Sequence, residues 1–253
     1  YRKDEIVLEI CLDHLLLSPV SCLDRLSVIA VDNYRVAAEL ESVRCTFSVK
    51  DILNVVWSYV HLMLASFDKH MDLYRNLTPA ILAYEGIAYQ YMAPTVFEEQ
   101  QLAYVQKHLR ILSAFYGVLK PMDGVTPYRL EMQAKANVNN QKNLYDFWGD
   151  NLYSKCKDED GIIINLASKE YSKCIEKFLK PFDTYITCTF CEMDKGKLVQ
   201  KGTYAKMARG EMVRFMAEKQ IKNPEEIKAF NRLGYEFREE LSCSTEYIFE
   251  RKV

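Results

Sequence analysis

The stretch "GIIINLASKEYSK", residues Gly161–Lys173, joins a buried strand to the start of a helix. Three isoleucines stand in a row in a nearly all-apolar run, which is typical of a strand that is covered on both faces. Ser168 follows this run and is a residue type that caps helices. The stretch therefore predicts a strand that passes directly into a helix over residues 168–179.

The segments that follow alternate between strand and helix patterns. "TYITCTF" and "KLVQKGTY" are predicted strands joined by the Gly-containing turn "CEMDKG". "AKMARGEMVRFMAEKQ" predicts a helix, and "NPEEIKAFNRLG" predicts another with an Asn cap and a Pro at its first position. "YEFREEL" and "EYIFERK" alternate apolar and charged residues, as half-exposed antiparallel strands do.

Helix signals also precede the opening stretch. "NLTPAILAYEG" has Thr78 as a candidate cap and Gly86 as a stop, and "NLYDFWGDNLYSKC" is expected to form one helix. "TVFEEQQLAYVQKHLRILSAFYG" repeats apolar residues every three or four positions, which predicts an amphipathic helix over 98–116 that Gly117 closes. The first seventy residues are expected to contain both helix and strand.

Composition sets the class of the molecule. The chain has 253 residues, of which 49% are apolar and 27% charged, as in soluble globular proteins. No linker-like segment divides it, so we expect one domain over residues 1–253, with a mixed α/β (α+β) fold and a mixed sheet flanked by helices. No run approaches the roughly 20 apolar residues of a membrane span, and no secretory signal is visible. We therefore expect a cytoplasmic protein without a membrane partner.

The cysteines and histidines do not indicate a metal site. The eight cysteines are spaced irregularly in a long chain, which favours free thiols over disulfides. Cys188 and Cys191 form one C-x-x-C, but a structural zinc site needs four ligands, no second pair exists and the four histidines are scattered. Nucleophile-elbow, phosphate-loop and dinucleotide motifs are also absent from the sequence. We expect no metal, no cofactor and no assignable catalytic residue.

Basic residues are concentrated in two segments of a chain with net charge −2. From Leu102 to Lys142 six lysines and arginines stand against two acids, and from Lys201 to Gln220 five stand against two. Local positive charge in a slightly negative chain is what an anionic partner would use. The alternative is that these charges are only solvated.

Three places in the chain are candidate anion sites. On a helical projection Lys206, Arg209 and Arg214 share one face, with Gly210 between them to let another backbone or a phosphate chain approach. Lys169 stands in the first turn of its predicted helix, where a cation opposes the helix dipole unless an anion is present. The turn-rich stretch "SAFYGVLKPMDGVTPYRLEM" carries Lys120 and Arg129, either on a simple connector or on a loop that holds an anion.

Several of these blocks resemble the YaaA family of bacterial peroxide-stress proteins. The resemblance rests on "LSAFYGVLKPMDGVTPYRLEM", "NLYDFWGD", "IINLASKEYSK", "KGTYAKMARGEMVRFM" and "FNRLGYEFREELSCSTEYIFER", in the family's order over about residues 73–251. Family members open with a strand and a "SPAK"-type motif. Here the nearest string is "LLLSPVSC", residues Leu15–Cys22, which lacks the lysine. The first seventy residues therefore do not match, and the role of that lysine is not carried over.

The resemblance implies a protein that limits oxidative damage to DNA and protein by lowering free intracellular iron. It also implies DNA binding through a positively charged cleft in one compact domain with a helix-hairpin-helix element, which we place at helix 98–116 and "YGVLKPMDG". The phosphate-binding positions are then Lys120, Arg129, Lys135, Lys169, Lys206, Arg209 and Arg214. The expected partner is double-stranded or branched DNA, read with low sequence specificity.

Two other functions remain open from the sequence. One is an enzyme that acts on a nucleic acid or a phosphorylated small molecule in the same cleft, with Tyr128, Asp146 and Glu170 as candidate acid and base groups. The other is an iron-binding protein, although no His/carboxylate cluster stands at ligand spacing in the sequence. The sequence leaves the oligomeric state open.

Overall fold

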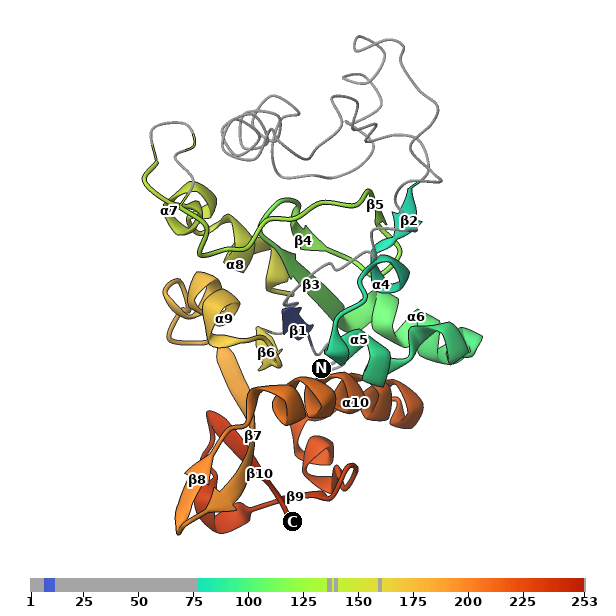
Figure 1. Ribbon diagram of the computed structural model, residues 1–253, viewed down its shortest axis with the longest axis vertical. Coiled ribbons are helices and arrows are strands. Elements are labelled where there is room, and N and C mark those ends of the chain that lie inside the picture. The colour runs from blue at the N-terminus through green and yellow to red at the C-terminus, as the bar shows by residue number, and fades with distance from the viewer. Residues whose placement is uncertain (1–6, 12–76, 136–137, 139–140, 159–160, 253) are drawn as a thin grey trace, which may run out of the picture.

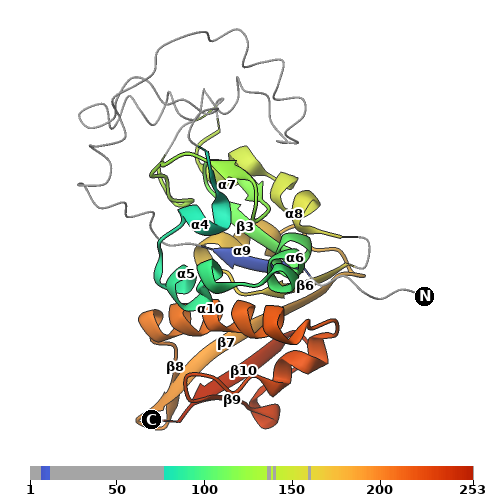
Figure 2. The same cartoon turned by 90° about the vertical axis from the view of Figure 1, so that its right-hand side faces the viewer.

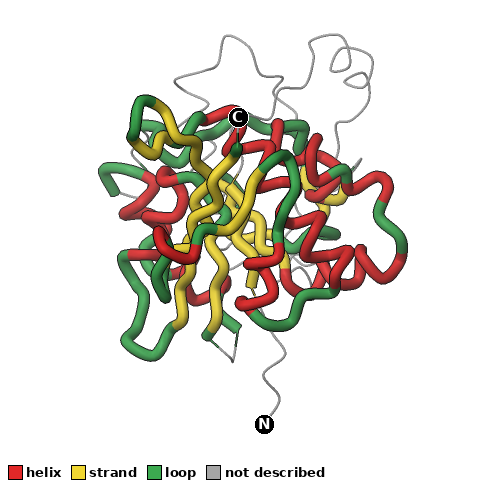
Figure 3. The backbone as a smooth tube through the Cα atoms, turned by 90° about the horizontal axis from the view of Figure 1, so that it is seen from below, coloured by secondary structure: helices red, strands yellow, loops and turns green. Residues whose placement is uncertain are grey.

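The computed structural model describes residues 7–11, 77–135, 138, 141–158 and 161–252. In this part of the chain one eight-stranded sheet runs through the molecule, with helices on both sides (Figures 1 and 3). The mixed α/β fold expected from the sequence is therefore confirmed. The helices and strands expected over residues 12–70 lie outside the described residues.

Five parallel strands form the middle of the sheet. The strand order is β4-β3-β1-β6-β7-β10-β9, with β8 paired to part of β7. Neighbours among β3, β1, β6, β7 and β10 are parallel, whereas β4, β8 and β9 pair antiparallel. The bounds are β1 Val7–Cys11, β3 Leu109–Ser113, β4 Gly117–Leu119, β6 Ile162–Asn165, β7 Thr184–Asp194, β8 Lys197–Val199, β9 Tyr235–Phe237 and β10 Glu246–Arg251. A two-stranded sheet pairs β2 (Thr78–Pro79) with β5 (Gly124–Val125).

Helices cover both faces of the main sheet. One face carries α4 (Ala80–Ala83), α5 (Ile87–Met92), α6 (Glu99–His108) and α10 (Gly202–Lys219). The other carries α7 (Leu144–Trp148), α8 (Asn151–Cys156) and α9 (Lys169–Glu176). The short 3-10 turns are η1 (Pro94–Val96), η2 (Pro224–Ala229) and η3 (Glu239–Leu241).

Strand β6 shows why the opening stretch decides the fold. Ile164 packs into the core under α10, and its neighbour Ile163 packs into the opposite core under α8 and α9. Both are fully buried, because successive side chains of a strand point to opposite faces and both faces are covered here. The predicted strand and its passage into α9 are confirmed.

The helix predicted over 98–116 is wrong in its second half. Helix α6 ends at His108, and residues 109–113 form β3, which pairs in parallel with β1. All five residues of β3 are buried, so buried and exposed positions do not alternate along it as they do in a half-exposed strand. Periodicity alone cannot distinguish a strand that is buried on both faces from a buried helix. Here the apolar residues of β3 continue, by coincidence, the spacing of three and four residues that begins in α6.

The helix-hairpin-helix element is not confirmed at its expected place. The chain there runs from α6 into β3 and returns through Tyr116 as β4, which pairs antiparallel with β3. The turn is therefore a β-hairpin that follows a helix and a strand. Gly117 has φ of 82° and lies against the Trp148 ring, which would leave little room for a side chain.

Other boundaries also differ from expectation. Thr78 and Pro79 form β2, and Gly86 starts α5 where it was expected to end a helix. Residues 143–156 form two helices, because Gly149 adopts φ of 53° between them. The Asn223 cap is confirmed, since its side chain accepts the Glu225 N–H, but the segment that it caps is the 3-10 turn η2.

Gly210 permits a close contact between helices α5 and α10. A Cβ atom built on it would lie 1.8 Å from the carbonyl oxygen of Ala88 in α5. Of the two roles considered for this glycine, the structure shows the approach of another backbone. The contact fixes α5 against the middle of α10.

Replacing Gly210 with Ala should therefore destabilise the protein. The added methyl group must push the α5 backbone away, so we expect the free energy of unfolding to fall by about 1–3 kcal/mol in urea titrations. Gly202→Ala is the matched control in the same helix, because a Cβ there meets nothing within 4 Å. Equal stability of the two variants would contradict this account of the contact.

Candidate nucleic-acid interface

The carboxyl ends of the parallel strands define one edge of the sheet, which we call the carboxyl edge. Strand β3 ends there at Ser113 and β6 at Asn165, on either side of β1. The Asn165 side chain accepts the N–H of Ala167 at 2.8 Å and donates to Thr187 Oγ1 at 3.2 Å. These bonds turn the chain from β6 into α9. In open α/β sheets ligands bind outside this edge.

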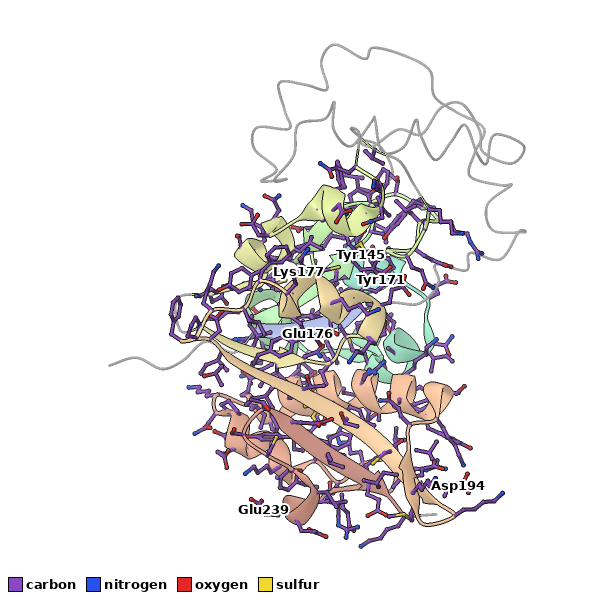
Figure 4. The ribbon with its side chains drawn as sticks, turned by 90° about the vertical axis from the view of Figure 1, so that its left-hand side faces the viewer. Tyr145, Tyr171, Glu176, Lys177, Asp194 and Glu239 are labelled. Carbon is purple, nitrogen blue, oxygen red and sulfur yellow. The ribbon has the colours of Figure 1, made fainter. Side chains whose placement is uncertain are left out.

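Two helices begin on this side of the molecule. Lys169 is the first residue of α9 and is exposed. In Figure 4 the helix runs from Tyr171, on the side where Asp194 marks the end of β7, to Glu176 and Lys177 on the opposite side. Strand β7 extends beyond β6, and α10 starts after β8 on the same side (Figure 2). A helix start carries partial positive charge, so both of these helix starts favour a negatively charged group nearby.

A chain of hydroxyl groups holds the loop after β5 against this edge. Ser113 Oγ accepts the backbone N–H groups of Phe115 at 3.1 Å and Tyr116 at 2.9 Å, and lies 2.6 Å from the Tyr128 hydroxyl. Because both lone pairs of Ser113 are used, its O–H donates to Tyr128. The Tyr128 hydroxyl lies 2.9 Å from that of Tyr84, whose pKa is raised by burial and then by Tyr128. The bonds join β3, this loop and the segment before α5.

A second contact joins the same loop to α9. The N–H of Gln133 donates to the Glu170 carboxylate at 3.1 Å. The hydroxyl of Tyr145 donates to the Glu170 carbonyl at 3.0 Å, and Figure 4 shows Tyr145 beside Tyr171. The basic residues that flank Gln133 are therefore held near the start of α9.

These contacts bring four of the expected cations to one side of the molecule. Arg129 and Lys135 lie on the loop, Lys169 starts α9, and Lys206 lies one turn before the contact of Gly210 with α5. The loop is tied to α9 through Gln133, and to the segment before α5 through Tyr128. We call Arg129, Lys135, Lys169 and Lys206, together with the starts of α9 and α10, the carboxyl-edge surface.

Lys120 lies elsewhere. It follows β4, which runs antiparallel to β3 and so leads away from the carboxyl edge. Its N–H donates to Asp123 at 2.8 Å in a tight turn, and the next residue but one, Met122, donates its N–H to Gln106 of α6. Lys120 is exposed, but the structure does not bring it to the other cations.

Arg209 and Arg214 do not share an open face with Lys206. Arg209 is half-buried, and its Nε atom is shielded from solvent. Burial raises the pKa of Cys188 in β7 to about 12, and the charge of Arg209 partly lowers it. Arg214 is half-buried and pairs with Glu218 at 2.8 Å, and Glu218 also binds Arg232. Helix α10 contacts both α5 and the sheet, which narrows the solvated arc that the helical projection predicted.

The candidate acid and base groups all have structural partners. Tyr128 bonds to Ser113 and Tyr84, and Glu170 accepts the Gln133 N–H. Asp146 accepts the Asn143 side-chain N–H at 2.8 Å at the start of α7. Each of the three residues therefore makes a contact that holds the local structure in place.

Glu192 is a buried carboxylate that the sequence did not single out. It lies 2.7 Å from Lys201, just before α10, and 2.7 Å from Arg251 of β10. The Lys201 hydrogen bond is the main cause of the lowered pKa of Glu192, and the Arg251 charge adds to it. The Arg251 guanidinium stacks at 3.7 Å on the ring of Tyr204. Glu192 thus fixes the start of α10 to the sheet.

The cysteines agree with the expectation of free thiols wherever they can be seen. Among the described residues, Cys156, Cys174, Cys188, Cys191 and Cys243 form no disulfide. Among the described residues no group of three or more His, Cys, Asp or Glu side chains could hold a metal ion. No helix in this part of the chain is long and apolar enough to cross a membrane.

Comparison with known proteins gives consistent matches. A family model described as peroxide stress protein YaaA matches residues 30–241, so the match begins earlier and ends earlier than the resemblance over 73–251. A UPF0246 protein of Agathobacter rectalis is 70% identical over 185 residues, which cover 73% of this chain and 74% of that protein. A UPF0246 protein of Desulfitobacterium hafniense is 58% identical over 179 residues, or 71% of each chain. One from Limosilactobacillus reuteri is 52% identical over 204 residues, covering 79% and 82%.

The hydroxyl chain should contribute measurably to stability. Tyr128→Phe removes the bridge and leaves the Ser113 and Tyr84 hydroxyls without it, so the free energy of unfolding should fall by about 1–3 kcal/mol. Tyr84→Phe should cost less in the Tyr128→Phe background than in the wild type, because the two hydroxyls share one bond. Additive losses in this double-mutant cycle would show that the two tyrosines are not coupled.

Proposed function

The chain belongs to the family of peroxide stress protein YaaA, and on this premise we propose that it binds DNA through the carboxyl-edge surface. The contacts go mainly to phosphates, so the affinity depends on salt and little on sequence. The proposal keeps Arg129, Lys135, Lys169 and Lys206 of the expected positions. It does not rely on Lys120, Arg209 or Arg214.

One observation carries the proposal, namely that basic residues stand at the starts of the two helices. Acidic residues are the usual choice there, because a helix start has partial positive charge. Helix α10 has no acid in its first turn and is preceded by Lys201, and α9 begins with Lys169. Glu170 follows in α9 and its carboxylate accepts the Gln133 N–H, so the phosphate contact at this helix start is assigned to Lys169. A DNA backbone that passes the two helix starts would place its phosphates near Lys169 and near the positive ends of both helix dipoles.

The layout favours backbone contacts over base reading. The cations come from a loop and from two helices that begin at the carboxyl edge of the sheet. Lysine contacts a phosphate as a compact point charge. No described helix is presented as a separate reading element, since α9 and α10 both pack on the sheet. We therefore infer double-stranded or branched DNA as the partner, bound with low sequence specificity.

In this proposal the bound protein protects DNA during peroxide stress, and the family's link to free intracellular iron extends to this chain. Iron matters for DNA damage because reduced iron converts peroxide into a species that attacks the nucleic acid. The proposal assigns no iron ligand among the described residues, where no suitable cluster stands. DNA binding is the part that the carboxyl-edge surface supports.

Removing Lys169 and Lys206 from the carboxyl-edge surface should weaken DNA binding. Lys169→Ala with Lys206→Ala removes two phosphate contacts, so we expect weaker binding to a duplex and a salt dependence whose slope falls by about 2. The measurement is fluorescence anisotropy over a series of salt concentrations. Circular dichroism would check that the fold is retained.

The matched control uses the opposite ends of the same helices. Lys177 follows the end of α9 and Lys219 ends α10, and both are exposed. Lys177→Ala with Lys219→Ala changes net charge equally but should leave the slope near the wild-type value. Equal loss in both double variants would mean that only overall charge matters, and that no specific surface exists.

A further inference from the structure

The hairpin of β7 and β8, residues Glu192–Val199, projects from the sheet beside the start of α10 (Figures 1 and 2). Its strands pair Glu192 with Val199, Met193 with Leu198 and Asp194 with Lys197. Lys195 and Gly196 form the turn with φ of 48° and 77°. Two residues with positive φ are the signature of the tight turn that matches strand twist, so this hairpin is a short, stiff ribbon.

Apolar side chains are exposed on this ribbon. Met193 is 50% exposed and Leu198 38%. They stand directly opposite one another, and paired residues of neighbouring strands share a face, so the two side chains form one small apolar surface. Single exposed apolar residues are ordinary on a protein surface. A pair of them at the end of a projecting ribbon forms a surface that can contact a partner.

Lysines flank the apolar pair along the chain, and Lys197 stands opposite Asp194 on the other face of the ribbon. Lys195 lies at the tip, Lys197 precedes Leu198, and Lys201 follows the ribbon. Asp194 is the exposed acid of this segment, while Glu192 is buried and already balanced by Lys201 and Arg251. Protein interfaces are depleted in lysine, whereas proteins that bend DNA combine basic residues with an inserted apolar side chain. The composition therefore favours DNA as the partner over a second protein.

The base of the ribbon is anchored firmly enough to act as a wedge. Glu192 joins it to Lys201 ahead of α10 and to Arg251 in the neighbouring strand, and Arg251 stacks on Tyr204 in the first turn of α10. The ribbon, the start of α10 and β10 thus form one unit. A phosphate chain held at the start of α10 would run close to the ribbon.

We propose that this hairpin enters the minor groove of the bound DNA and presses Met193 and Leu198 against a base step, with Lys195 and Lys197 on the flanking phosphates. This inference rests on the proposed DNA binding and adds a second element to it. An apolar wedge partly unstacks the step and kinks the duplex, which allows more of the backbone to reach the protein. The wedge would favour steps that unstack easily.

The test measures base unstacking separately from binding. Duplexes carry the fluorescent base 2-aminopurine at successive positions, and its emission rises when the base loses its stacking neighbours. The wild-type protein should raise the emission at the step that it wedges. Met193→Ala with Leu198→Ala should lose most of this rise while keeping the salt dependence of binding, because no lysine is changed.

The matched control truncates two exposed leucines away from the ribbon. Leu233 and Leu241 are each 36% exposed, and Leu233→Ala with Leu241→Ala should leave the emission rise unchanged. Wild-type binding without any rise would overturn the wedge and leave the proposed function standing. An absence of duplex binding would overturn both. If the ribbon variant altered only the sedimentation of the protein, the pair would face a second copy of the chain, and the wedge would be wrong.

Discussion

The hydrogen-bonded hydroxyls of Ser113, Tyr128 and Tyr84 are the constraint on which the candidate surface depends. They join the end of a central strand, the basic loop and the segment before α5. From there the contact of Ala88 with Gly210 continues to α10, and Gln133 continues from the loop to α9. Segments that carry cations and are far apart in the sequence are thereby held at the carboxyl edge of the sheet, although none of these contacts involves a cation.

The cations differ in how closely they are paired with acidic side chains. Arg214 is committed to Glu218, and Lys201 to Glu192. Lys169 is the first residue of α9, and its position there does not depend on an acidic partner. Arg129 is held only loosely to Glu131, because the two charged groups are 3.7 Å apart on the surface. Exposed pairs of this kind contribute little stability, so an arriving phosphate can compete for the arginine. The local excess of positive charge in the sequence therefore overstates the charge that is available to a partner.

The sequence predicted the elements with the strongest local signals and missed those that tertiary packing decides. Strand β6, helix α10 and the β7–β8 hairpin were identifiable from an apolar run, an amphipathic repeat and a glycine turn. Strand β3 was not, because burial on both faces removes alternation, although Lys107 and His108 in the last turn of α6 could have marked a helix end. The close approach of α5 to Gly210, which narrows the open face of α10, joins two segments that are far apart in the sequence, and neither segment reveals it alone.

The central claim is that DNA lies on the carboxyl-edge surface, and amide hydrogen exchange with and without a duplex tests it most directly. Backbone N–H groups at the start of a helix lie at the end of its ladder of hydrogen bonds, so a ligand that covers a helix start slows their exchange. The account predicts slower exchange on DNA binding in residues 128–135, 168–172 and 202–206, and no change in 153–158 and 180–183 at the opposite edge. Protection at the opposite edge, with none at the helix starts, would contradict it.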